Sequence, residues 1–282
     1  MNPDRRRPTV DRTESPSSVV CRSSDFRIAR ILAKSFWPFV ALFLDGKTFA
    51  ADKMVIALGI TLAGENVLLG FVQTGTENER VCGAFLRALL ERGLRAEQGQ
   101  LCIIDGANGL RKTLQAVIGS HALVQRCQWH KRENVVGYLP TAQQAAWRRK
   151  LQTAYEQPSY PEAKAALHRL RQEPRLVNIS AVTSLDEGQE TLTLYRLGLF
   201  EALGRSLKTT NCLESIMAQV GQRTDKIDHW RTSDQKQRWV ATALLDIEPR
   251  LRRIKGYRHL PLLGSALQRE STTRAGNQEH VA

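Results

Sequence analysis

Three short apolar runs stand close together in the first third of the chain and constrain its fold more than any other feature. They are VALFLD at 40–45, MVIALGIT at 54–61 and VLLGFVQTG at 67–75. The segments between them, DGKTFAADK and LAGEN, are rich in residues that favour turns. The pattern predicts three successive strands in a meander.

Helical and strand-like segments alternate after the meander. A helical pattern at 76–93 precedes the run LCIID at 101–105, and a second at 107–119 precedes the run ALVQRC at 122–127, with a third helical pattern at 129–139. The resulting order is β-β-β-α-β-α-β-α. This order predicts an α/β, ribonuclease-H-like mixed sheet in which the first strand lies beside the fourth and helices cover the sheet.

The rest of the chain is predicted to be mostly helical. Alanine, leucine, glutamine and charged residues recur at helical spacing from 141 onward, which indicates an all-helical insertion. The expected parts are a disordered leader at 1–39, the first part of the core at 40–140, the insertion at 141–205, the glutamate-bearing and C-terminal core helices at 206–260 and a polar tail at 261–282.

Positive charge exceeds negative charge by a wide margin. The chain has 41 lysines and arginines against 28 aspartates and glutamates, a formal net charge of +13 and a pI near 9.9. An excess this large, spread along the sequence, favours a polyanionic partner, with nucleic acid first among them. The alternative is a merely basic soluble protein.

Cysteine and apolar patterns favour a cytoplasmic protein. The five cysteines show no CxxC spacing, which fits reduced thiols. The most apolar stretch is FWPFVALFL at 36–44, and it is too short to span a bilayer, which takes about 20 residues. No membrane association is therefore expected.

Two aspartates close two of the predicted strands. Asp45 ends the first strand and Asp105 ends the fourth. If those strands are neighbours, both carboxylates emerge at the same edge of the sheet, where hard oxygen ligands suit Mg²⁺. Three carboxylates usually hold the pair of ions that assists phosphodiester chemistry.

Each candidate carboxylate also has a purely structural interpretation. Asp45 and Gly46 form a good hairpin turn, and Asp105 could cap the helix that follows it. Glu214 stands three residues after Asn211, which is the spacing of a capping box.

The segment CQWH contains half of a zinc site. Cys127 and His130 have ligand spacing, but the sequence offers no second such pair to complete four ligands, so a structural zinc is not expected. His130 could instead orient a phosphate or a neighbouring carboxylate, or be a buried histidine satisfied by the backbone.

Five segments together resemble the Mutator-type transposases of bacterial insertion sequences. The resemblance runs from Val40 to Gln268 and rests on LFLDGKTFA, IIDGANGLRKTLQAVIG, ALVQRCQWHKRENVVGYLP, SLKTTNCLES and KIDHWRTSDQKQRWVATALLDIEPRLRRIKGYRHL. It implies that Asp45, Asp105 and Glu214 are a DDE triad binding two Mg²⁺ ions, with Mn²⁺ as a substitute. Cys127 and His130 match the family's C-x-x-H, and the helical segment matches its insertion before the glutamate.

The same resemblance implies a reaction and its partners. Water would cut the phosphodiester at an element end, and the freed 3′-hydroxyl would attack target DNA. The expected partner is double-stranded DNA, both inverted-repeat ends and target, handled by a homodimer that is cytoplasmic and associated with the nucleoid. The candidate DNA-contacting residues are Lys131, Arg132, Arg223, Lys226, Trp230, Arg252, Arg253 and Lys255.

The alternatives for those candidates are a solvated surface charge for each basic residue and core packing for Trp230. The leader does not resemble the helical region that in the family precedes the first catalytic strand and binds element ends. An alternative function is therefore a truncated, catalytically inactive DNA-binding remnant that inhibits a complete transposase. A ribonuclease or junction resolvase on the same fold is a third reading.

Overall fold

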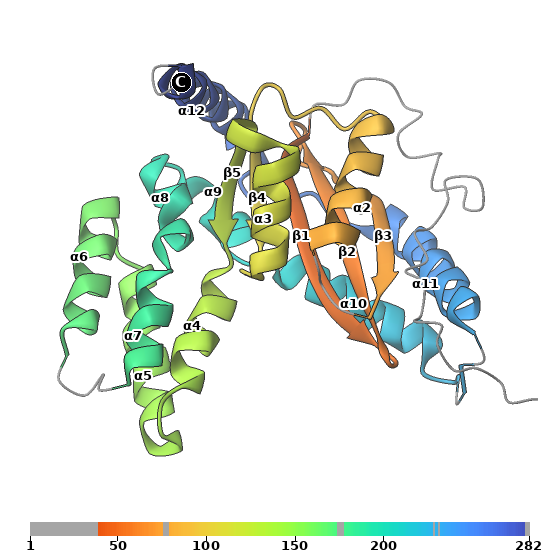
Figure 1. Cartoon of the computed structure of the whole chain (residues 1–282), viewed down its shortest axis with the longest axis horizontal. Helices are drawn as coiled ribbons and strands as arrows, with labels where there is room; N and C mark the ends of the chain where they lie inside the picture. The colour runs from red at the N-terminus through yellow and green to blue at the C-terminus, as the bar shows by residue number, and fades with distance from the viewer. Residues whose placement is uncertain (1–38, 76–78, 174–177, 228, 231, 280–282) are drawn as a thin grey trace, which may run out of the picture.

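A mixed sheet forms the centre of the molecule (Figure 1). The computed structural model describes residues 39–75, 79–173, 178–227, 229–230 and 232–279. Within them, the sheet has five strands in the order β3-β2-β1-β4-β5. The strands are β1 (Phe39–Phe49), β2 (Asp52–Thr61), β3 (Asn66–Thr74), β4 (Gln100–Ile104) and β5 (Ala122–Arg126).

The strand pairing confirms the predicted order of elements. β1 to β3 form an antiparallel meander, whereas β4 runs parallel to β1 and β5 runs parallel to β4. The two parallel connections contain α2 (Glu79–Glu91) and α3 (Asn108–Val117). The first strand therefore lies beside the fourth, as predicted. The predicted leader falls on residues that, apart from Phe39, lie outside the described ones.

β1 is longer than the sequence predicts. Asp45 does not end this strand, because Gly46 pairs with Val55 and the ladder continues until Phe49 faces Asp52. The turn lies at residues 50–51, where Ala50 has a positive φ of 53°. The hairpin-turn interpretation of Asp45 and Gly46 is wrong, because pairing with β2 keeps DGKTF extended.

Side chains alternate between the two faces of the sheet, and each face has its own core. Leu42 and Leu44 pack with α2 and α3 on one face. Ala41 and Phe43 point to the other face, which is covered by the helices of the C-terminal half. These helices are α9 (Phe200–Leu207), α10 (Asn211–Thr224), α11 (Ser233–Ile247) and α12 (Leu260–Glu279).

The predicted insertion consists, in its described part, of helices joined by short turns. Its helices gather beside the sheet, beyond β5 (Figure 1). They share a third core with α4 (Gln128–Gly137), in which Trp147, Leu151 and Tyr155 are buried. The insertion contains α5 (Thr141–Tyr155), α6 (Tyr160–Arg171), α7 (Ile179–Asp186) and α8 (Thr193–Arg196), and it leads into α9.

The polar tail predicted at 261–282 is instead helical up to Glu279. Leu260, Leu263 and Leu267 of α12 are fully buried against the sheet, in the same core as Val40. Their spacing puts them on one helical face, but Pro261, Gly264 and the polar second half of the helix hide that pattern in the sequence. Among the described residues, no helix is long and apolar enough to cross a membrane.

Lys131 is a buried cation that ties α4 to the insertion. Its side chain has no exposed surface, and its Nζ donates to Ser184 Oγ at 3.1 Å and lies 3.6 Å from a carboxylate oxygen of Glu187. Burial, and secondly the charge of Arg126, lower the pKa of Lys131 from 10.5 to about 8, although Glu187 opposes the shift. At neutral pH the folded protein therefore holds Lys131 largely in its charged form, which burial disfavours.

This lowered pKa predicts a pH-dependent stability. Between about pH 8 and pH 10 the unfolded chain holds a proton on Lys131 that the folded chain lacks, so stability rises with pH. Relative to Lys131→Met, the wild type should gain about 2 kcal/mol of unfolding free energy from about pH 7.5 to pH 9.5. Urea unfolding of both proteins measures this difference, and parallel pH curves would contradict the assignment.

Candidate active site

The register between β1 and β4 places two aspartates side by side. Leu44 pairs with Ile104 at the end of the parallel ladder, so Asp45 and Asp105 are the next residues of the two strands. Asp45 also has the strand parity of Ala41 and Phe43, which directs its side chain to the face covered by α10. The neighbouring strands thus present both carboxylates at one edge, as predicted.

Glu214 reaches this edge from the first turn of α10. The helix begins at Asn211 and packs on β1, with Leu213 and Ile216 in the core. No side chain caps its N-terminus, so the capping-box interpretation of Asn211 and Glu214 is not realised. The Glu214 carboxylate is free to face the sheet.

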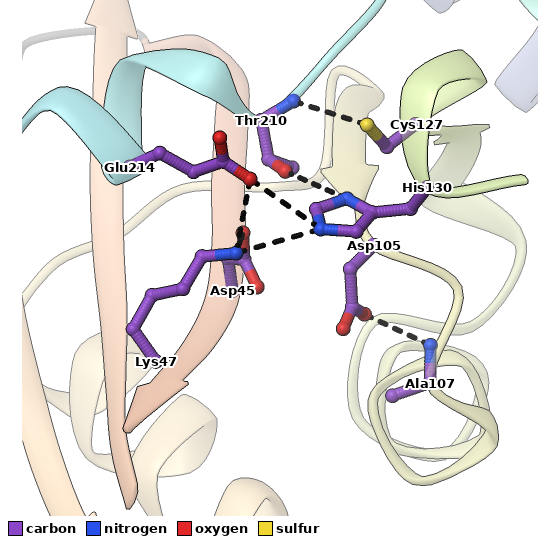
Figure 2. Close-up of polar contacts among 8 residues, drawn as sticks. All are labelled: Asp45, Lys47, Asp105, Ala107, Cys127, His130, Thr210 and Glu214. Atoms are coloured by element: carbon purple, nitrogen blue, oxygen red, sulfur yellow. Dashed lines mark hydrogen bonds and ion pairs between the residues drawn. The ribbon is translucent and has the colours of Figure 1, made fainter. Parts of the chain in front are cut away.

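Lys47 lies at the centre of the site, and the sequence analysis did not identify it (Figure 2). Its Nζ is 3.2 Å from Asp45 Oδ2, donates to Glu214 Oε1 at 3.1 Å and is 3.4 Å from His130 Nε2. One residue, Gly46, separates it from Asp45 in an extended strand, so both side chains point to the same face. The spacing of Asp45 and Lys47 would have predicted that they share a face, but only if the strand continues past Gly46, where the sequence favours a turn.

The Asp45 carboxyl group is short of positive charge. It is 1% exposed, and neither of its oxygens accepts a hydrogen bond of good geometry. Burial, and then the negative charge of Asp105, raise its pKa from 3.8 to about 7, while Lys47 opposes the rise. The carboxylates raise the pKa of Lys47 in turn, against the effect of its burial. A cation bound here would restore Asp45 to its charged form.

The donor set fits a divalent cation. Asp45, His130 and Glu214 each offer one ligand atom, and these atoms lie within 4.8 Å of one another. Asp105 is not part of this group, and its Oδ1 accepts a hydrogen bond from the backbone N–H of Ala107 at 2.9 Å (Figure 2). Its Oδ2 is the oxygen available to a cation. The carboxylate oxygens suit Mg²⁺ or Mn²⁺, whereas the imidazole is a ligand more typical of transition metals.

Cys127 and His130 connect the strand edge to the glutamate helix. The backbone N–H of Cys127 donates to Ile104 at 2.7 Å, and its Sγ accepts from the backbone N–H of Thr210 at 3.4 Å. His130 Nδ1 lies 3.3 Å from the Thr210 hydroxyl, and its Nε2 lies 3.4 Å from Glu214 Oε1. The C-x-x-H segment therefore positions Glu214 from two directions.

Four of the predicted DNA contacts are held by the protein itself. Lys131 is buried, so it is not accessible to DNA in this conformation. Arg132 donates to Glu133 and Gln152, and Arg223 pairs with Asp246 at 2.7 Å. Trp230 is half-buried and packs edge-on against Phe49, with 5.1 Å between ring centroids.

Three others lie at the opposite end of the sheet from Asp45. Arg252, Arg253 and Lys255 are exposed in the segment whose Ile254 N–H donates to the Gly64 carbonyl in the β2–β3 turn. Arg253 also lies 3.6 Å from a carboxylate oxygen of Glu65. The eighth candidate, Lys226, is exposed near the end of α10.

Trp129 is an exposed aromatic at the site that the sequence analysis also missed. Its side chain is 39% exposed, and its ring stands edge-on to His130 with 4.8 Å between centroids. Its position beside His130 in CQWH was visible, but its exposure depends on how α4 docks.

Comparison with known proteins gives a consistent family assignment. A family model described as "Transposase, Mutator family" matches residues 39–252. The transposase for insertion sequence element IS905 of Lactococcus lactis subsp. lactis (strain IL1403) is 26% identical over 215 residues, which cover 74% of this chain and 54% of the relative.

Two further relatives have similar extents. The transposase for insertion sequence element IS406 of Burkholderia multivorans (strain ATCC 17616 / 249) is 32% identical over 203 residues, covering 69% of this chain and 50% of its own length. The transposase for insertion sequence element IS256 in transposon Tn4001 of Staphylococcus aureus is 27% identical over 199 residues, covering 68% and 48%. The chain spans about half the length of the curated relatives it matches.

The connection through Cys127 predicts a specific pattern of stability. Cys127→Ala should lower the unfolding free energy by about 1–3 kcal/mol, because it leaves a small void and an unpaired Thr210 N–H. Cys127→Ser keeps an acceptor and should cost less. At Cys102, which lies in the apolar core beside α3, serine should be no better than alanine. Urea unfolding tests this, and equal losses for both Cys127 variants would contradict it.

Proposed function

Because the chain belongs to the Mutator family of transposases, we propose that it is the catalytic part of a DDE-type DNA transposase. It would cut DNA at the ends of an insertion element and join those ends to target DNA. The observation that supports this most strongly is the meeting of Asp45, Asp105 and Glu214 at one edge of the sheet. Residues from distant parts of the sequence supply these carboxylates.

The proposed fold class is ribonuclease-H-like. The strand order β3-β2-β1-β4-β5, with an antiparallel meander followed by two parallel strands, supports it. The location of Asp45 and Asp105, directly after the last residues that pair between β1 and β4, also supports it. The fold does not by itself imply an activity, so the argument for function rests on the site.

The proposed ligands for two Mg²⁺ ions, or Mn²⁺ in their place, are Asp45, Asp105 and Glu214, with His130 within reach of the same position. Such a pair of ions would activate the attacking oxygen and stabilise the leaving oxygen of a phosphodiester. In the proposed reaction, water attacks the phosphodiester at the element end, and the freed 3′-hydroxyl then attacks target DNA.

The protein's own groups would each have a distinct part. Asp45 is paired with Ile56 of β2, and the residue before it, Leu44, is paired with Ile104 of β4. Glu214 is 35% exposed in its side chain, so it stands where a DNA backbone can approach. His130, fixed by Thr210, orients the Glu214 carboxylate. The site would therefore have one buried ligand, Asp45, and one partly exposed ligand, Glu214.

Double-stranded DNA is the proposed partner, both element ends and target. The net charge of +13 supports it, because basic side chains that neutralise phosphates release the counterions of DNA into solvent, which favours binding. A homodimer that brings two element ends together and is associated with the nucleoid is part of the same proposal.

Removing a proposed ligand should strongly reduce cleavage while sparing the fold. Asp105→Asn and Glu214→Gln are each expected to reduce Mg²⁺-dependent cleavage roughly a hundredfold or more, because the ions stabilise the transition state by several kcal/mol. Glu201→Gln, an exposed carboxylate on α9, is the matched control. The assay follows labelled duplex DNA that carries the element's inverted repeats.

Each other outcome of this assay has a definite meaning. Cleavage that survives both ligand substitutions would contradict the proposed triad. Binding without cleavage in the wild type, under Mg²⁺ and Mn²⁺ alike, would indicate the non-catalytic remnant. Preference for RNA–DNA hybrids or four-way junctions over linear duplex would indicate a ribonuclease or a resolvase.

A further inference from the structure

We propose that Lys47 is a built-in counter-cation that occupies a divalent-ion position of the site and must leave it before the ion binds. This inference rests on the proposed metal site and adds a residue that competes for it. Lys47 is then a positioning residue, and it sets how tightly the protein holds divalent ions before DNA arrives.

The contacts of Lys47 define the position. The three groups around its Nζ are Asp45 Oδ2 at 3.2 Å, Glu214 Oε1 at 3.1 Å and His130 Nε2 at 3.4 Å. They are the same three residues whose ligand atoms lie close enough to hold one ion. An ammonium and a divalent ion cannot both occupy the space between these atoms.

The burial of Asp45 explains why a cation is needed between the carboxylates. Asp45 is almost completely buried, and Asp105 raises the energy of its charged form. Two unscreened carboxylates repel each other more strongly in a partly buried site than in water. The Lys47 ammonium offsets that repulsion, and a divalent ion would offset it more completely.

Lys47 can also leave without unfolding anything. Its side chain is 23% exposed, while its backbone is fixed by pairing with Met54 in β2. A lysine side chain is a flexible stem that ends in a compact point charge, so rotation about its side-chain bonds moves the ammonium toward solvent. The strand beneath it keeps its register.

The test is Mn²⁺ binding to the full chain without DNA, followed through the electron paramagnetic resonance signal of free Mn²⁺. Lys47→Met and Lys47→Gln remove the competing charge, and each should lower the Kd roughly tenfold, equivalent to about 1.4 kcal/mol. Lys47→Arg keeps the charge and should not tighten binding. Lys164→Met makes the same charge change at an exposed position of α6 and should have no effect. Asp45→Asn identifies the site, because it should abolish the binding.

The outcomes separate this inference from the proposed function. Tighter binding in both neutral variants, with Lys47→Arg and Lys164→Met unchanged, would support it. Binding that depends on Asp45 but is equal or weaker in the neutral variants would overturn the role of Lys47 and leave the metal site standing. Absence of binding in the wild type and the neutral variants alike would overturn both. Two neutral variants are used so that a folding defect in one does not decide the result.

Discussion

The parallel pairing of β1 with β4 is the constraint on which the site depends. It ends at Leu44 and Ile104, so the chain must place two acidic residues next to each other directly after the last shared pair. Like charges this close are unfavourable, and burial, followed by the charge of Asp105, raises the pKa of Asp45 to about 7. The remaining features of the site, Lys47 above all, reduce it.

The glutamate reaches this edge through a chain of contacts rather than through the sheet. Cys127 bonds to Ile104 at the end of β4 and to Thr210 just before α10, and His130 contacts both Thr210 and Glu214. A short segment after β5 thus fixes the start of a helix more than eighty residues later in the sequence. The helical insertion between them shares a core with α4, so its packing also supports the helix that carries His130.

Much of the fold and part of the site could be predicted from the sequence. Apolar runs and helical spacing are local signals, and they were sufficient for the order of elements and for Asp45 and Asp105 as neighbours. The continuation of β1 through DGKTF depends on β2, and the burial of Leu260 and Leu263 in α12 depends on the sheet, so neither was visible locally. The position of Lys47 between carboxylates depends on the docking of α10, and the burial of Lys131 depends on the insertion.

The separation of the carboxylates along the sequence also bears on protein synthesis. Asp45 and Asp105 belong to the half of the core that leaves the ribosome first, whereas Glu214 follows only after the insertion. A polypeptide interrupted during translation before residue 214 has two of the three acidic groups and lacks the helix that presents the third. Since domains tend to fold as they emerge, unfinished chains would hold an incomplete set. For an enzyme whose proposed substrate is DNA, this order delays the assembly of a cutting centre until nearly the whole core exists.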